Sequence, residues 1–411
     1  MVDNRQLRLT TVALFFVLLI DGISQGLIFP ILTNTLVSVH AHEFVAHLSM
    51  GERNVLYGIC LGVFFLCWFL GAPILGSLSD SIGRRKALLI CLSGAALGFI
   101  LTALAFLLHS LALLILGRVI SGFTTGSQPI AQATIIDLCD PAKRARYMAL
   151  IILAVSVGFV LGPVMGGFLS DPNIVSWFSN ETPLYIATLL TLLNMLLLYS
   201  SFRESITAKH IAKINLSSAV RVFISAFAHP TVKILTVLFL ILQLGWMMYQ
   251  VYASSYLAQR YGLSITENAF FMIMVGIGAS LGFVLCSVCE KRFQARTIIS
   301  TGYGILGICV LLTLLIPGPV FAWIIAIPAC ASLALGYTFI MKLYAAQVGA
   351  DKQGWAMGIA GGVAALVSGI AAVVSGVLAA INLNIPLIIS VCLLFIGCFL
   401  MIKWRARYTQ A

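Results

Sequence analysis

Charged residues are scarce in this sequence of 411 residues, of which only 9% are Asp, Glu, Lys or Arg. Hydrophobic residues make up 61% of the chain and the mean hydropathy is +1.07, whereas an ordinary soluble domain has roughly 45–50% apolar residues. The scarcity of charge therefore excludes an ordinary soluble domain. We interpret the chain as an all-α integral membrane protein.

Three further absences narrow the class of protein. The ten cysteines are scattered, nearly all in apolar segments, and do not form the framework of a disulfide-stapled domain. The N-terminus MVDNRQLRLT lacks a short apolar region followed by a small-residue cleavage site, so we expect the first apolar segment to be kept as a membrane helix. No nucleophile or metal-ligand set has the spacing of a catalytic site, so we expect no enzyme, cofactor or bound metal.

Long apolar segments fill most of the chain. A helix that crosses a bilayer needs about 20 mostly apolar residues, and the sequence contains twelve such segments separated by short polar stretches. We place these segments at 9–37, 54–78, 87–108, 111–138, 147–170, 183–202, 231–259, 266–289, 297–316, 319–346, 354–380 and 385–402.

The net charge of +11 could indicate nucleic-acid binding, but the positions of the basic residues favour a membrane protein. Of the 24 Lys and Arg residues, only Arg53 and Arg260 fall in loops after odd-numbered segments, and Arg118 and Lys342 fall inside segments. The others lie near the termini and in loops after even-numbered segments, as expected of cytoplasmic loops. We therefore predict cytoplasmic N- and C-termini and no nucleic-acid partner.

The longest polar interruption, 203–230, divides the chain into two halves. It reads as a basic cytoplasmic linker between six-helix bundles at 1–202 and 231–411. A displacement of 210 residues aligns the halves faintly, as expected of a transporter built from two related bundles. This displacement places Gly126 on Gly336, Gly166 on Gly376, Asp80 on Glu290 and Lys86 on Arg296.

The stretch GSLSDSIGRRKALL, residues 76–89, forms the predicted cytoplasmic turn after the second segment. Gly76 and Gly83 permit a close backbone approach, Asp80 can pair with Arg84, and the basic run that includes Arg85 marks the inner face. The alternative interpretation is that this run is a solvated topology signal alone.

The same stretch resembles the loop signature G-x-L-x-D-x-x-G-R-[RK] of the major facilitator superfamily. The resemblance implies a fold of two six-helix bundles that transports small molecules by alternating access. It also implies that Gly76, Asp80, Gly83, Arg84 and Arg85 form a gate that latches the bundles in the outward-facing state. Asp137, at the end of segment 111–138, matches a further acid of that gate.

Segment 147–170 contains GFVLGPVMGG, a glycine-rich pattern that permits close helix packing. It resembles the G-x-x-x-G-P-x-x-G-G motif of the drug:proton antiporter branch. The residues that match this motif are Gly158, Gly162, Pro163, Gly166 and Gly167. The alternative is helix packing without a directional role.

Asp21, in LLIDGISQGLIFP, lies about 12 residues from the inner end of its segment, or roughly 18 Å, which is near mid-membrane. An ionised carboxylate there costs at least about 2.5–3.5 kcal/mol, so burial favours a protonated group, a partner or a cavity. Ser24 and Gln25 fall on the same side of the helix. The pattern resembles tetracycline-efflux and related exporters, which implies a role in proton or substrate coupling. The alternative is a structural aspartate paired with a cation.

Arg118, in LILGRVISGFTTGSQ, also lies inside a segment and matches a family R-x-x-x-G pattern through Gly122. We expect Arg118 to assist proton movement or to bind an anionic group of the substrate. The alternative is a purely structural partner for Asp21 or for a carbonyl. A predicted polar stripe along this helix lines a cavity and comprises Arg118, Ser121, Thr125, Gln128 and Gln132.

Segment 231–259 places Gln243, Trp246, Tyr249 and Gln250 on one face, which suits a planar amphipathic substrate. Lys342 lies near an inner helix end, where a snorkelling side chain is favoured over substrate binding. The loop HAHEFVAH, with His40, His42 and His47, could hold a divalent metal, but a solvated loop is favoured.

Together these features predict a proton-coupled antiporter, most simply a monomer in a bacterial-type inner membrane, that exports a small amphipathic compound. Its partners would be that small molecule, protons and the lipid bilayer. One alternative keeps the fold but carries an anionic metabolite, an amino acid or a carboxylate-rich metal chelator. Another alternative, from a different class, is a non-transporting receptor or assembly factor.

Overall fold

The computed structural model describes residues 4–38, 44–139, 141–202, 204, 230–347 and 353–403, in which the chain forms helices and no strand. Almost all of the predicted linker 203–230 lies outside these residues. In chain order the helices are α1 (Asn4–Leu32), the π-helix η1 (Thr33–Val37), α2 (Met50–Ile82), α3 (Arg84–Leu107), α4 (Leu111–Thr124), α5 (Ser127–Leu138), α6 (Pro141–Phe168), α7 (Thr182–Ser201), α9 (Pro230–Tyr261), α10 (Ile265–Arg292), α11 (Ala295–Leu315), α12 (Pro319–Gln347), α13 (Gln353–Ile381) and α14 (Ile385–Lys403).

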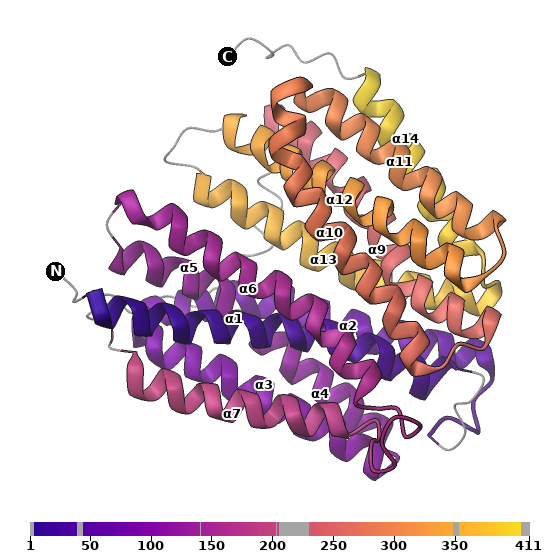
Figure 1. Cartoon of the computed structure of the whole chain (residues 1–411), viewed down its shortest axis with the longest axis horizontal. Coiled ribbons are helices and arrows are strands. Elements are labelled where there is room, and N and C mark those ends of the chain that lie inside the picture. Colours follow the sequence, from indigo (N-terminus) through magenta and orange to yellow (C-terminus); the bar gives the residue numbers. More distant parts are fainter. Residues whose placement is uncertain are drawn as a thin grey trace.

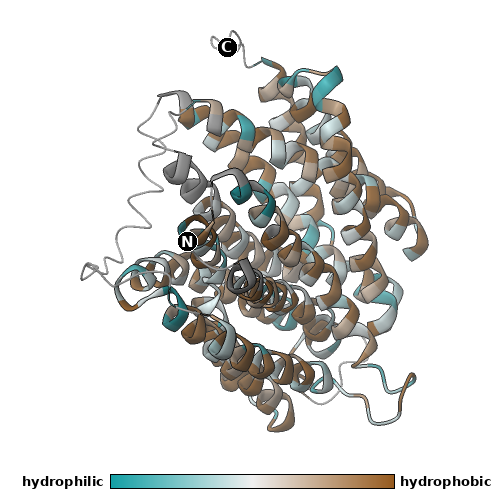
Figure 2. Ribbon diagram, turned by 60° about the vertical axis from the view of Figure 1, so that its left-hand side comes forward, coloured by the Kyte–Doolittle hydropathy of each residue, from teal (hydrophilic) through white to brown (hydrophobic). Residues whose placement is uncertain are grey.

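The helices have the length and composition of membrane spans. Among the described residues, eleven helices are long and apolar enough to cross a bilayer. Figure 2 shows these helices brown along most of their length, with hydrophilic teal mainly near turns and helix ends. The remaining predicted span, 111–138, corresponds to the shorter helices α4 and α5, of 14 and 12 residues. The predicted all-α membrane fold is confirmed.

The prediction of one continuous helix over 111–138 is wrong at its centre. The helix is interrupted at Thr125 and Gly126, whose backbone φ and ψ angles are −76° and 70°, and −130° and 9°. Pro129, four residues after Thr125, has no N–H to donate to the carbonyl of Thr125, and its ring crowds that carbonyl. The break places the beginning of a new helix, α5, deep inside the protein.

Helices α1–α7 and α9–α14 form two groups, indigo to magenta and orange to yellow in Figure 1. Within the first group α1 packs on α6 and α7, and α3 on α4 and α7; within the second, α12 packs on α10 and α11, and α14 on α9 and α11. The main contacts between the groups are those of α2 with α13 and of α6 with α10.

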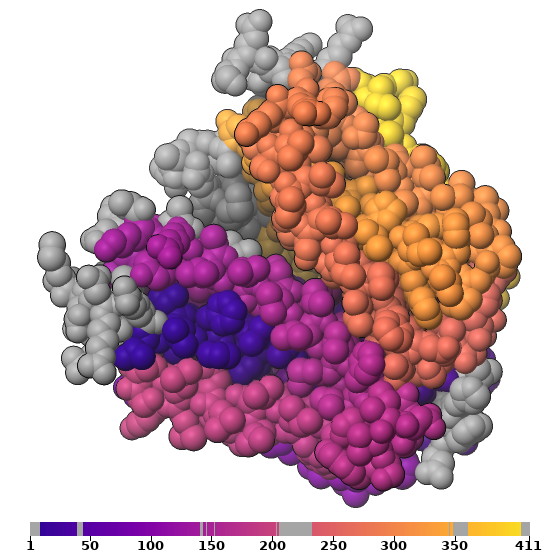
Figure 3. All heavy atoms as spheres, in the orientation of Figure 1, coloured from indigo at the N-terminus to yellow at the C-terminus, as the bar shows by residue number. Residues whose placement is uncertain are grey.

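The two groups meet at one end and separate at the other. The ends that separate are those that the charge pattern places in the cytoplasm, and they are called inner ends below. Figure 3 shows a hollow between the coloured atoms of α6 and α10, and Figure 1 shows these two helices diverging towards their inner ends. The arrangement is therefore inward-facing.

Candidate functional site

The predicted gate residues form an ion-pair cluster at the inner end of α2. Arg84 Nη1 lies 2.6 Å from Asp80 Oδ1, and Arg84 Nε lies 3.2 Å from Asp137 Oδ2. Arg84 Nη1 also donates to Ser79 Oγ at 2.5 Å. Gly83, between α2 and α3, has a φ of +99°, which a side chain would strain. The sequence-predicted pairing of Asp80 with Arg84 is present, and Asp137 joins it.

Glu204 completes this cluster and was not predicted from the sequence. Its carboxylate accepts hydrogen bonds from the backbone N–H groups of Arg84, at 2.8 Å, and Arg85, at 3.2 Å. These N–H groups belong to the first turn of α3, where a negative charge also interacts favourably with the helix dipole. The Arg85 guanidinium stacks 4.4 Å from the centroid of the Tyr199 ring. All these contacts lie within the first group of helices.

The inner part of α2 has no close contact with the described atoms of α13. A Cβ at Gly76, near the inner end of α2, would meet no described atom within 4 Å. Nearer the outer end the same two helices are in close contact, because a Cβ at Gly58 would lie 2.6 Å from the carbonyl oxygen of Ala372. A Cβ at Gly376 would lie 2.6 Å from the carbonyl oxygen of Asn54. Only glycine permits this approach.

Hydrogen bonds between the two groups accompany this outer seam. Gln259 Nε2 donates to Asn54 Oδ1 at 2.7 Å, and Tyr57 Oη donates to the carbonyl of Val251 at 3.0 Å. Thr266 Oγ1 donates to Asp171 Oδ2 at 2.6 Å. Sequence reasoning missed these residues, because single polar groups near helix ends carry no recognisable pattern.

Asp21 lies in α1 with its side chain buried. Ser127 Oγ, at the first position of α5, donates to Asp21 Oδ1 at 3.4 Å. The carboxyl therefore faces the N-terminal end of α5, which carries a partial positive charge. Among the described residues, no cation forms an ion pair with Asp21. The break in the predicted helix is what brings this helix end to Asp21.

Arg118 is fully buried and does not pair with Asp21. No guanidinium nitrogen of Arg118 is hydrogen-bonded to a described residue. The guanidinium carbon of Arg118 lies 5.4 Å from the centroid of the Phe64 ring on α2. The alternative that Arg118 neutralises Asp21 is therefore wrong for this conformation. A buried cation without a described partner is costly, which makes Arg118 a candidate for binding water or an anion.

The predicted polar stripe does not form a single cavity wall. Ser121 packs against α3, because a Cβ at Gly98 would collide with Ser121 Oγ. Thr125 Oγ1 donates to the carbonyl of Ser121 at 2.7 Å, and so bonds within its own helix. Gln128 and Gln132 are half-buried on α5, beyond the break. The predicted stripe assumed one continuous helix over 111–138, and the structure has two helices there, α4 and α5.

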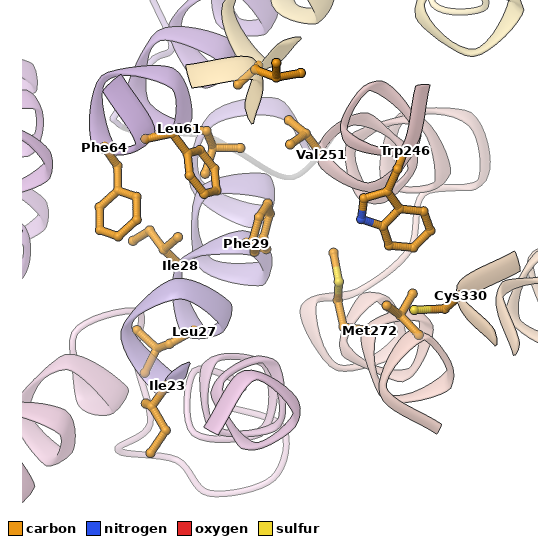
Figure 4. Close-up of a cluster of buried hydrophobic side chains, with 14 of the residues drawn as sticks. Ile23, Leu27, Ile28, Phe29, Leu61, Phe64, Trp246, Val251, Met272 and Cys330 are labelled. Carbon is orange, nitrogen blue, oxygen red and sulfur yellow. The ribbon is translucent and has the colours of Figure 1, made fainter. Parts of the chain in front are cut away.

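A cavity of approximately 520 Å³ lies between α6, α9, α10 and α12 near the middle of the membrane. Gln243, Trp246 and Gln250 of α9 line it, as predicted. Tyr249 does not, because its ring packs against those of Trp246 and Phe271, with centroids 5.8 and 6.1 Å away. Figure 4 shows the Trp246 side chain turned towards Met272 and Cys330.

The lining of this cavity differs from the predicted site in two respects. It includes Ser156, Ser280 and Tyr337 from other helices, which sequence reasoning missed because single polar residues on separate helices form no motif. It does not include Asp21 or Arg118, nor the other predicted residues of the first group of helices, Ser24, Gln25, Ser121, Thr125, Gln128 and Gln132.

The glycine motif of α6 packs mainly on α1. A Cβ at Gly162 would lie 2.6 Å from the backbone nitrogen of Leu27, and one at Gly158 or Gly166 would collide with other α1 carbonyls. Pro163 lies against Gly26 of α1. Gly167 instead faces Ala269 of α10, in the other group of helices. Most of the motif therefore joins two helices of one group, and one glycine contributes to the outer seam.

Two remaining candidates lie outside the cavity. Lys342 Nζ pairs with Glu290 Oε2 at 2.5 Å, and both side chains are exposed. This contact agrees with a snorkelling lysine near an inner helix end. His40 and His42 lie outside the described residues, whereas His47 lies within them. No group of three metal-binding side chains occurs in the described part of the chain.

The sequence matches the Major Facilitator Superfamily over residues 14–372. The chain belongs to this superfamily. It is a transporter, and not an enzyme, as predicted. The superfamily match includes the loop signature, Asp21, Arg118 and the glycine motif of α6.

Several relatives are tetracycline resistance proteins. The class B protein of Escherichia coli is 32% identical over 196 residues, which are 48% of this chain and 44% of that protein. The chain thus spans less than half the length of this relative. The class E protein of Escherichia coli is 26% identical over 367 residues, covering 87% of this chain and 83% of that protein.

Solved transporters share the fold. A bacterial homologue of the human lysosomal transporter Spinster, in an inward-facing and unoccupied conformation, has a TM-score of 0.73 and 16% identity, covering 99% of this chain and 100% of that one. The human organic anion transporter MFSD10 has a TM-score of 0.62 and 20% identity, covering 96% and 99%.

Proposed function

We propose that this transporter is a proton-coupled antiporter that exports a small amphipathic compound by alternating access. The observation that carries the proposal is the buried carboxyl of Asp21, which contacts the Ser127 hydroxyl and no described cation. A carboxylate in this position is stabilised by the N-terminal end of α5, whereas burial favours the protonated form. Asp21 is thus placed to change its protonation state as water reaches it from one side of the membrane or the other.

The cavity supports an amphipathic cargo. It is lined by apolar side chains, the Trp246 indole and the amides of Gln243 and Gln250, and no acidic or basic residue lines it. Such a lining favours flat, largely apolar molecules with a few hydrogen-bonding groups. The names of the tetracycline resistance relatives point in the same direction.

The gate cluster supports alternating access. In this inward-facing arrangement Asp80, Arg84 and Asp137 bond within the first group of helices, while a Cβ at Gly76, on the inner part of α2, would meet no described atom within 4 Å. Closure of the inner ends would bring the second group against this cluster. We propose that this contact latches the outward-facing state, in a monomer held in a bacterial-type cytoplasmic membrane.

Proton flux in proteoliposomes tests the proposal. Purified protein is reconstituted with an imposed pH gradient, and proton movement is recorded while tetracycline and other amphipathic drugs are added. We expect drug-dependent proton flux that is lost in Asp21→Asn. Glu290→Gln serves as the control, because it neutralises an exposed acid at the inner end of α10. Drug movement that ignores the gradient, or coupling that survives in Asp21→Asn, would refute a coupling role for Asp21.

A second candidate function is transport of an organic anion, such as a carboxylate-containing metabolite, amino acid or chelator. It is favoured by the unpartnered guanidinium of Arg118 and by the likeness of the fold to the organic anion transporter. Arg118 does not line the described cavity, so this candidate requires a conformation that exposes it. Loss of anion binding in Arg118→Ala would support this candidate, whereas retained binding with lost proton coupling would support the first.

A further inference from the structure

The cavity between α6, α9, α10 and α12 is open at its rim. Six residues both line the cavity and remain exposed. Leu153, Val157 and Leu161 of α6 are 52%, 37% and 39% exposed, Phe283 of α10 is 50% exposed, and Tyr337 of α12 is 36% exposed. The sixth is Ser280 of α10. The three α6 residues follow a spacing of four, so they lie on one face of the helix. The cavity therefore opens to the outside of the protein along the edges of α6 and α10.

The rim lies at the depth of the lipid chains. The membrane span of α6 begins at Arg146, so Leu153 and Leu161 lie 7 and 15 residues along it, or roughly 10 and 22 Å at 1.5 Å per residue. Phe283 lies nine residues before Arg292 at the inner end of α10, or roughly 14 Å from it. Since the hydrocarbon core is about 30 Å thick, the rim spans its inner and central parts.

The chemistry of the rim matches hydrocarbon and not water. Of its six exposed side chains, four are apolar (two leucines, a valine and a phenylalanine), one is a tyrosine and one is a serine whose hydroxyl bonds within α10, and the whole cavity lining contains no charged residue. Exposure of such side chains to water is unfavourable by about 25 cal/mol per Å², whereas exposure to lipid chains carries no such penalty. An opening into the bilayer accounts for this composition.

The outer part of the same seam is closed. A Cβ at Gly276 would collide with the Val160 side chain, and Gly167 packs on Ala269 nearer the outer end. The opening is therefore restricted to the inner and central portions of the seam.

The deep part of the cavity offers hydrogen bonds that the protein does not use. Gln243 and Gln250 are 5% and 3% exposed, and neither amide is hydrogen-bonded to another residue in the described part of the chain. By contrast, the Ser280 hydroxyl donates to the carbonyl of Gly276 at 3.0 Å. Buried amides normally have partners, so these two indicate a polar ligand group bound beside Trp246.

We propose that the cavity takes an uncharged amphiphile dissolved in the inner leaflet, which moves sideways between α6 and α10 with its polar group towards Gln243 and Gln250. The apolar body of this ligand occupies the rim, where it contacts Val157 and Phe283. The role of the ligand as exported cargo rests on the proposed function, whereas the existence of the lateral opening does not.

Fluorescence quenching of Trp246 tests the opening without knowledge of the cargo. The native chain and Trp246→Phe are reconstituted in phosphatidylcholine with brominated acyl chains, and the difference between the two emission signals isolates Trp246. We expect brominated lipid to remove most of the Trp246 signal and aqueous iodide to remove little of it. Quenching by iodide alone would show an opening to water, and quenching by neither would show a sealed cavity; each result overturns the proposal.

Matched variants calibrate the signal in the Trp246→Phe background. Leu196→Trp, on the exposed face of α7, gives the quenching expected in full contact with lipid, and Phe99→Trp, in the buried core, gives the background. With Trp246 restored, Val157→Phe should narrow the rim and reduce quenching by brominated lipid. Unchanged quenching in Val157→Phe would refute this location of the opening.

The proton-flux assay separates the two proposals. Asp21→Asn should lose coupling and keep the brominated-lipid quenching of Trp246, because Asp21 does not line the cavity. Quenching without any drug-coupled proton flux in the native protein would refute the antiporter and leave the lateral opening intact. Drug-coupled proton flux without brominated-lipid quenching of Trp246 would refute the lateral opening and leave the antiporter intact.

Discussion

Replacement of Gly58 by alanine is expected to shift the protein from the inward-facing arrangement towards an outward-facing one. The new Cβ would lie 2.6 Å from the carbonyl oxygen of Ala372, whereas ordinary van der Waals contact begins near 3.4 Å. The seam must therefore open locally by roughly 0.8 Å (3.4 − 2.6). Because backbone atoms line both sides, no side-chain rotation relieves the contact.

The size of the shift follows from the cost of overpacking. Inserting a methyl group into a well-packed interface costs about 1–3 kcal/mol, which corresponds to roughly a 5- to 150-fold change in an equilibrium constant. The penalty falls on the state in which the outer seam is closed. The population of the state with an open outer seam should rise by that factor.

Cysteine labelling from outside measures this population. Ser254 is fully buried at the outer seam, where its hydroxyl lies 3.3 Å from that of Thr33. A membrane-impermeant thiol reagent should label Ser254→Cys slowly in the native background and faster, by the factor above, in Gly58→Ala. The control is Gly361→Ala on α13, where the new Cβ meets no described atom within 4 Å.

Two results would refute this reasoning. One is an unchanged labelling rate in a Gly58→Ala protein that retains its native melting temperature. The other is equal acceleration by Gly361→Ala. Gly376→Ala provides an independent check, because its Cβ would meet the Asn54 carbonyl across the same seam at 2.6 Å.

Three further outcomes are expected. Arg84→Ala should lower the free energy of unfolding by about 1–3 kcal/mol. Asp80→Asn should lower it by less than about 1 kcal/mol, because Asp80 is 62% exposed. Thermal melting in detergent tests whether Arg84→Ala is the more destabilising of the two. Gly158→Ala should destabilise the α1–α6 contact, near the upper end of about 1–3 kcal/mol, and a native melting temperature would contradict this. Burial raises the pKa of Asp171, but hydrogen bonds from Thr266 and Asn173 outweigh burial and hold this pKa below 3.8. The ionised Asp171 therefore stabilises the closed outer seam above pH 3.8, and this stabilisation is lost only as the pH falls through the lowered pKa. Labelling of Ser254→Cys should thus stay slow down to about pH 5 and rise in Asp171→Asn, and a rise in the native chain near pH 6 would exclude Asp171 as the cause.

Hydropathy and local charge were sufficient to predict much of the fold and the ion pair of Asp80 with Arg84. The bilayer requires long apolar helices, so the spans are visible as composition alone. Asp80 and Arg84 are four residues apart, which makes their pairing a local property of the sequence. Asp137 came from the family resemblance, and its contact with Arg84 depends on how α5 packs against α3.

The helix break shows where such reasoning stops. Pro129 and Gly126 are visible in the sequence, but membrane helices often retain proline when neighbouring groups satisfy the freed carbonyl. Whether the helix breaks therefore depends on packing with α1 and α2. The prediction that Ser121 lines the cavity was wrong for the same reason: the sequence does not reveal whether a polar stripe faces a cavity or a neighbouring helix.

The outer seam could not be predicted for a related reason. Gly58 and Gly376 are two of 35 glycines, and only their pairing across α2 and α13 distinguishes them. Small residues in membrane helices mark close packing without identifying the partner. Asn54 and Gln259 likewise gain significance only because the fold brings them within 2.7 Å of each other.

In the proposed antiporter, the packing of α1 provides a route by which Asp21 would influence a cavity that it does not line. One face of α1 presents Asp21 to the beginning of α5, and another presents Gly22 and Gly26 to α6. Because glycine contacts bring the two backbones together, α1 and α6 are expected to move as a unit. Since α6 carries Val157 at the cavity rim, a displacement of α1 on protonation of Asp21 would alter the gap between α6 and α10. In such an arrangement proton and cargo compete through the position of one helix pair, without sharing a binding residue.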